Sequence, residues 1–271
     1  MRSSNPVLTS LVNDRGNAYG AYTNNVNSPF GAAYSSQVSD DNRPMTVDDV
    51  VSKTAITVGV IIVFAVLNFG IALWVSTSMA MLLTIVGGIG GFITVLVSAF
   101  SKSYGSKAIT LTYAVLEGLF LGGFSLLLTG VTVGGANAGV MISQAILGTI
   151  GVFLGMLYVY KTGAVKVTPK FNRVVTASII GVAVLALGNL LLAVFTGANP
   201  LRDGGTLAII FSLVCIGLAA MSFLQDFDLA DRMVRQGAPA KSAWGIALGL
   251  SVTLVWLYTE ILRLLSYFQQ R

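Results

Sequence analysis

Seven long apolar segments, separated by short polar connections, constrain this sequence more than any other feature. A helix that crosses a lipid bilayer needs roughly 20 predominantly apolar residues. Segments of this kind lie near 55–75, 79–100, 108–129, 138–160, 174–196, 206–227 and 243–265. Only 10% of the 271 residues are charged, against about 25% in a typical soluble domain, which is too few to coat a water-exposed surface. The sequence therefore predicts an all-α membrane protein with seven transmembrane helices.

The N-terminal part differs in composition from the rest of the chain. Residues 1–50 are rich in Asn, Ser, Gly and Tyr and contain no apolar run of membrane length. Because such a segment cannot bury enough apolar surface to fold alone, we expect 1–50 to be a disordered cytoplasmic tail and 51–271 to be the membrane domain. Near the end of the tail, Thr46 is followed three residues later by Asp49, a pattern typical of the start of a helix.

The connections between the segments carry a strong charge bias. Positively charged residues gather in connections that stay in the cytoplasm. Thirteen Lys and Arg residues fall on one side of the predicted membrane: Arg2, Arg15, Arg43, Lys53, Lys102, Lys107, Lys161, Lys166, Lys170, Arg173, Arg232, Arg235 and Lys241. The other side has two, Arg202 and Arg271. This predicts a multi-pass protein of the cell membrane with a cytoplasmic N-terminus and an extracytoplasmic C-terminus, and the dispersed charge excludes a nucleic-acid surface.

Glycines recur at helical spacing within the apolar segments. The pairs Gly118 with Gly122 and Gly151 with Gly155 are small-xxx-small patterns, which let two membrane helices approach closely. The cluster at 87–91 (GGIGG) superficially resembles a nucleotide-binding loop, but no strand precedes it and no Lys-Ser or Lys-Thr follows. We therefore expect these glycines to pack helices within one bundle, with a homodimer contact as the less favoured alternative and a monomer as the favoured state.

Charged residues inside the apolar segments are the main candidates for function, because each costs about 2.5–3.5 kcal/mol to insert. Glu260 and Arg263 are three residues apart, hence on one helical face. They can form an ion pair within the helix, or Glu260 can face the bundle centre and share its charge with a second carboxylate. Asp226 is either such a carboxylate or a hydrated group at a helix end, with Asp228 nearer to water.

Glu117 is the fourth intramembrane candidate, and it has both a functional and a structural interpretation. It can take part in a carboxylate pair, or it can be an acid satisfied by a hydrogen bond to a neighbouring helix, where Asn68 and Asn189 also lie in apolar segments.

Carboxylates limit the chemistry that the chain can perform. Two of them held close in a low dielectric do not both ionise easily and titrate as a unit, which makes a proton switch. Carboxylate oxygens are also preferred ligands of calcium. The sequence has no histidine and no lysine within an apolar segment, which excludes Ser-His and Ser-Lys nucleophiles and histidine metal ligation. We expect no enzyme activity and no cofactor, with calcium as a permeant ion at most.

Three segments, taken in order along the chain, resemble the Bax inhibitor-1 family. Residues 113–122 (YAVLEGLFLG) resemble its EGxxLG signature. Residues 224–228 (LQDFD) are similar to the Asp-containing end of its sixth helix, and residues 256–265 (WLYTEILRLL) look like the last helix of its YccA-type bacterial branch. The resemblance covers about residues 44–268.

The resemblance implies a fold and a function. The fold would be six helices in two three-helix layers around a central seventh, C-terminal helix. The function would be a calcium leak gated by protonation of a carboxylate pair, which maps onto Asp226 and Glu260, with Glu117, Asp228 and Arg263 as supporting polar groups. An alternative role in the bacterial branch is to bind and modulate another membrane protein, such as a membrane-bound protease.

The spacing of the proposed pair makes a geometric demand. Asp226 and Glu260 are 34 positions apart, and the turn between their helices is expected near 237–239. From there, Asp226 lies ~18 Å along one helix and Glu260 ~33 Å along the other, at 1.5 Å per residue. Contact requires an extension before the seventh helix or a bend near Gly245 or Gly249; otherwise Glu260 has another partner, with Glu117 as a candidate.

Overall fold

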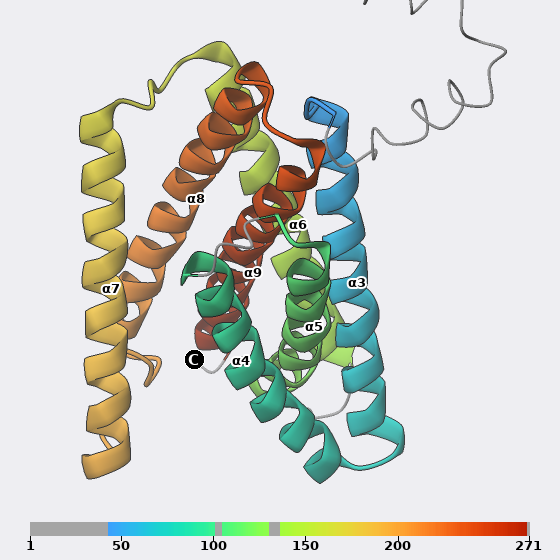
Figure 1. Ribbon diagram of the computed structural model, residues 1–271. Coiled ribbons are helices and arrows are strands. Elements are labelled where there is room, and N and C mark those ends of the chain that lie inside the picture. The colour runs from blue at the N-terminus through green and yellow to red at the C-terminus, as the bar shows by residue number, and fades with distance from the viewer. Residues whose placement is uncertain (1–42, 101–104, 130–135, 270–271) are drawn as a thin grey trace, which may run out of the picture. The chain divides into compact units, whose positions relative to one another are not determined.

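The computed structural model describes residues 43–100, 105–129 and 136–269, so residues 1–42 of the predicted tail at 1–50 lie outside them. Within these ranges, seven helices are long and apolar enough to cross a membrane, which confirms the predicted fold class. They are α3 (Val47–Trp74), α4 (Thr77–Phe100), α5 (Lys107–Thr129), α6 (Ala136–Thr162), α7 (Pro169–Thr196), α8 (Thr206–Arg235) and α9 (Ala243–Gln269), as Figure 1 shows. Several helices are longer than the apolar segments, because their polar first or last turns continue the same hydrogen bonding.

The start of α3 shows how local sequence sets a helix boundary. The Thr46 side chain accepts a hydrogen bond from the Asp49 backbone N–H, and the Asp49 carboxylate accepts one from the Thr46 backbone N–H. This reciprocal capping box satisfies two N–H groups that have no partner inside the helix. The helix start predicted from Thr46 and Asp49 is therefore confirmed.

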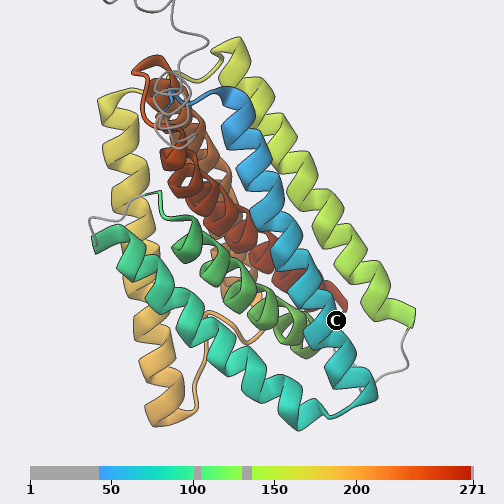
Figure 2. The same ribbon diagram turned by 45° about the vertical axis from the view of Figure 1, so that its right-hand side comes forward.

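The C-terminal helix α9 lies at the centre of the bundle, with α3, α4 and α5 on one side and α6, α7 and α8 on the other (Figures 1 and 2). In the apolar 18-residue stretch of the α9 span, 67% of the residues are buried, against 6% in the corresponding stretch of α7. A helix buried on most of its faces packs in the middle of a bundle, whereas α7 leaves nearly its whole apolar surface exposed on the outside of the bundle. This arrangement is the two-layer fold that the resemblance implied.

Close contact between α3, α4 and α5 depends on glycine. A Cβ atom added to Gly122 would lie 2.4 Å from the Ala65 carbonyl oxygen of α3, and one added to Gly87 would lie 2.4 Å from the Leu116 carbonyl oxygen of α5. The expectation of tight packing is thus confirmed for Gly122 and for the 87–91 cluster. It is wrong for Gly151 and Gly155, which are exposed and would place a Cβ within 4 Å of nothing among the described residues.

We call the end of the bundle where α3 begins and α8 ends the basic end, because Lys53, Lys107, Lys161, Arg232 and Lys241 lie there. The chain entering α3 is attached to the turn between α8 and α9. The Met45 N–H donates to the Ala238 carbonyl at 2.7 Å, and Lys53 Nζ donates to the Ala240 carbonyl at 2.5 Å. The first and last helices of the membrane domain are therefore joined at this end.

Candidate functional site

Asp226 lies on α8 and faces the central helix α9. Thr253 Oγ1 of α9 donates a hydrogen bond to Asp226 Oδ2 at 2.7 Å. A Cβ added to Gly249, one turn earlier on α9, would lie 4.0 Å from Asp226 Oδ1, so the glycine leaves open space beside the carboxylate. One face of α9 thus offers Asp226 a hydroxyl donor and room for a further small group.

Aromatic packing holds α8 in the orientation in which Asp226 faces α9. Phe223 and Phe227 flank Asp226 in sequence, are buried, and stack on each other with ring centroids 6.0 Å apart. Phe153 of α6 packs edge-on against both rings, at 5.4 and 5.5 Å. Because these rings turn toward α6, Asp226 turns toward α9.

Glu260 and Arg263 form an ion pair within α9. Arg263 Nη1 lies 2.5 Å from Glu260 Oε1, and the two side chains are 8% and 5% exposed, respectively. The Arg263 guanidinium also lies 5.5 Å from the ring centroid of Phe124 on α5, a cation–π distance. The sequence allows either an ion pair within the helix or a Glu260 that shares its charge with a second carboxylate. The structure shows the ion pair.

The structure does not bring Asp226 and Glu260 together as a carboxylate pair. Asp226 is at the level of Thr253, and Glu260 is seven residues further along α9, or about 10 Å at 1.5 Å per residue. The reason is register: from the α8–α9 turn, the chain runs about as far to Thr253 as to Asp226. Neither an extension nor a bend of α9 removes the offset.

The other predicted residues have separate surroundings. Glu117 lies on α5 against α4, where a Cβ added to Gly91 would lie 2.6 Å from Glu117 Oε2. Asn68, one of the two asparagines considered as its partner, instead donates to Thr84 Oγ1 and to the Leu119 carbonyl. Asp228 pairs with Arg232 one turn later at the basic end. Among the described residues, no three acidic, Cys or His side chains come close enough to hold a metal ion.

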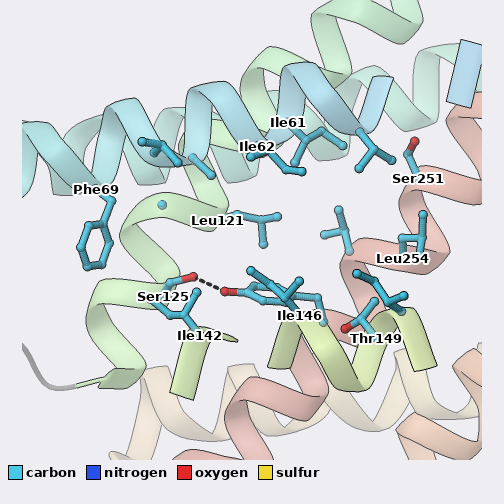
Figure 3. A pocket seen from close by; sticks show the side chains of 17 residues that line it. Ile61, Ile62, Phe69, Leu121, Ser125, Ile142, Ile146, Thr149, Ser251 and Leu254 are labelled. Carbon is cyan, nitrogen blue, oxygen red and sulfur yellow. Dashed lines mark hydrogen bonds between the residues drawn. The ribbon is translucent and has the colours of Figure 1, made fainter. Parts of the chain in front are cut away.

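An apolar cavity of about 350 Å³ lies between α3, α5, α6 and α9. Figure 3 shows its lining, in which Ile61, Leu121 and Ile146 face the cavity and Ser125 forms a hydrogen bond with the Tyr258 hydroxyl at 2.8 Å. No charged side chain lines it. The polar residues of its lining are Ser125, Thr149, Ser251 and Tyr258.

Thr253 and Arg202 are the residues of interest that sequence reasoning missed. A threonine in an apolar segment carries no distinctive signal, and Thr253 is identified only by its contact with Asp226, 27 positions away. Arg202 was counted as one of two positive charges on its side of the membrane, yet it lines a second cavity with Glu260. Only the folded arrangement of α7, α8 and α9 reveals that proximity.

A family model described as Bax inhibitor 1 like matches residues 5–270, nearly the whole chain. No curated protein matches the chain closely enough to serve as a relative.

Proposed function

The chain belongs to the Bax inhibitor 1 like family, and we propose from this premise that it is a pH-sensitive calcium leak of the cell membrane. In this proposal the basic end of the bundle faces the cytoplasm and the C-terminus lies outside. The charge bias of the connections supports that orientation, because positively charged connections are retained in the cytoplasm. The family resemblance supports the choice of calcium, and the carboxylates supply the oxygen chemistry that calcium prefers.

The hydrogen bond between Thr253 and Asp226 is the observation that carries the proposal. It joins α8 to the central helix α9 through one titratable group, inside the part of the bundle that an ion would cross. The hydrogen bond to an ionised carboxylate is charge-assisted and stronger than one to a neutral carboxyl group. Protonation of Asp226 therefore weakens the α8–α9 contact, and in our proposal the leak opens when the proton is bound.

The mechanism differs from a shared-proton pair, because the partner of Asp226 is a hydroxyl that does not ionise. A single proton then controls the gate, so the ratio of open to closed protein changes at most about tenfold per pH unit. Glu260 remains paired with Arg263 two turns away, and in this proposal that pair supports the gate and does not bind the ion.

A liposome flux measurement tests this proposal. Purified wild-type protein is expected to pass calcium at a rate that rises as the pH falls from about 8 to 6, with the single-proton slope given above. The Asp226→Asn variant carries a neutral amide of the same shape, so its flux should stay at the acidic wild-type level at every pH. Thr253→Val removes the donor and should raise the flux at neutral pH.

Asp228→Asn is the matched control, because Asp228 is two residues away on the same helix but pairs with Arg232 instead of α9. It should keep the wild-type pH response. A calcium flux that is indifferent to pH and to both Asp226→Asn and Glu260→Gln would remove the leak proposal.

The second candidate function is that of a non-transporting regulator that binds another membrane protein, such as a membrane-bound protease. The attachment of Met45 and Lys53 to the α8–α9 turn favours it, since a partner that pulls on the preceding tail would act directly on α8 and α9. Deletion of residues 1–43 should then abolish capture of that partner from native membranes while the membrane domain still folds. If the deletion leaves every partner and phenotype unchanged, regulation through the tail is excluded.

A further inference from the structure

A second cavity, of about 210 Å³, lies between α7, α8 and α9 toward the end of the bundle opposite the basic end. Its walls are mostly apolar, with Val182 from α7, Phe211 from α8 and Trp256 from α9. Two charged residues also line it, Glu260 from α9 and Arg202 from the connection between α7 and α8. An apolar chamber with a carboxylate and a guanidinium is an unusual combination inside a membrane bundle and calls for a ligand.

Glu260 has one oxygen that lacks a hydrogen-bond donor. Oε1 is paired with Arg263, but Oε2 is buried and has no hydrogen-bond partner among the described residues. A buried carboxylate oxygen without a donor is costly. Glu260 is one of the residues that line the cavity, so a ligand held there is the nearest source of a donor for Oε2.

In the part of the chain that the structure describes, Arg202 lacks an anionic partner, whereas Glu260 Oε2 lacks a hydrogen-bond donor. Its connection is held in place by Asn189 of α7, which accepts a hydrogen bond from the Leu201 N–H at 3.1 Å and donates one to Asn199 at 2.5 Å. Within the described part of the chain, the Arg202 guanidinium pairs with no carboxylate. Burial and the nearby Arg263 charge lower the pKa of Arg202, whereas Glu260 raises it. Arg202 therefore lies within electrostatic range of the Glu260–Arg263 pair and lacks an anion.

We propose that this cavity binds a zwitterion, with a primary ammonium donating to Glu260 Oε2 and an anionic group accepting from Arg202. A free cation fits poorly, because two guanidinium groups face one carboxylate. A simple anion fits poorly as well, because it offers no donor to Oε2. The headgroup of an aminophospholipid and a free apolar amino acid share the required chemistry, and the apolar walls accommodate the remainder of either. This inference is independent of the proposed calcium leak.

The test compares ligands that share the anionic group but differ in whether they carry a primary ammonium. Wild-type protein in nanodiscs is titrated with phosphatidylethanolamine and with phosphatidylcholine, whose quaternary ammonium has no N–H, and binding is measured by native mass spectrometry. The primary amine should bind about tenfold more tightly, the value of one charged hydrogen bond. Free leucine is compared with N-acetylleucine in the same way, and its competition with phosphatidylethanolamine distinguishes a soluble ligand from a lipid.

Arg202→Gln is the decisive variant, because it leaves the Glu260–Arg263 pair intact and lies outside the helices. It should weaken the preferred zwitterion by about tenfold. Arg235→Gln, at the far end of α8 in an exposed pair with Asp231, is the control and should bind as the wild type does. Loss of the preference for the primary amine in both ligand pairs, or an affinity for the preferred zwitterion that Arg202→Gln leaves unchanged, overturns the proposal.

Discussion

Replacing Gly122 by alanine is expected to lower the free energy of unfolding by about 2–3 kcal/mol, the cost of an overpacked core site. The new Cβ would lie 2.4 Å from the Ala65 carbonyl oxygen and 3.0 Å from the Asn68 Cβ. The obstruction is largely backbone, which cannot rotate away, so α3 and α5 have to separate along their whole crossing. Thermal unfolding in detergent, followed by circular dichroism or by tryptophan fluorescence, measures the loss.

Gly151→Ala is the matched control for this prediction. Gly151 lies on α6, is exposed, and has no described atom within 4 Å of an added Cβ. Alanine loses less backbone freedom than glycine when a helix forms, so this variant should be unchanged or more stable by about 0.5–1 kcal/mol. Equal effects of Gly122→Ala and Gly151→Ala would contradict the close α3–α5 crossing.

These two glycines show which parts of the fold the sequence predicts. Helix number and helix starts follow from local information, because apolar length and caps such as Thr46 act within a few residues. The pairs Gly118–Gly122 and Gly151–Gly155 are identical in local pattern, yet one lies at a helix crossing and the other faces outward. A pair of glycines at this spacing indicates that a second helix can pack closely against the first. Whether a second helix lies at that place depends on the packing of the whole bundle.

The sequence predicts the candidate site only in part, because here too the contacts depend on how the helices pack. Asp226, Glu260 and Arg263 stand out because charge is rare in apolar segments, and the i, i+3 spacing correctly allows the Glu260–Arg263 pair. The partner of Asp226 could not be found in this way, because Thr253 is neutral and common in membrane helices. Helix register set by the α8–α9 turn selects Thr253 over Glu260, and that register is a property of the folded bundle.

Replacing Arg263 by methionine should destabilise the protein by about 3–5 kcal/mol, since removing one partner leaves the other as an uncompensated buried charge. Glu260 would then retain neither its 2.5 Å contact with Arg263 nor a donor at Oε2. The chemical unfolding midpoint in mixed micelles should fall accordingly. Arg232→Met, which breaks the i, i+4 pair of an Arg that is 54% exposed, should change stability by less than about 1 kcal/mol.

A double variant separates the loss of charge pairing from the loss of packing. In Glu260→Gln with Arg263→Met, neither position carries a charge, and both side chains keep nearly their original volume. If unpaired charge is the cause, the double variant should recover much of the stability lost in Arg263→Met, because replacing a buried ion pair by neutral groups is often close to neutral. If the double variant is as unstable as the sum of the single ones, the energy instead comes from packing of the Arg263 side chain, including its contact with the Phe124 ring.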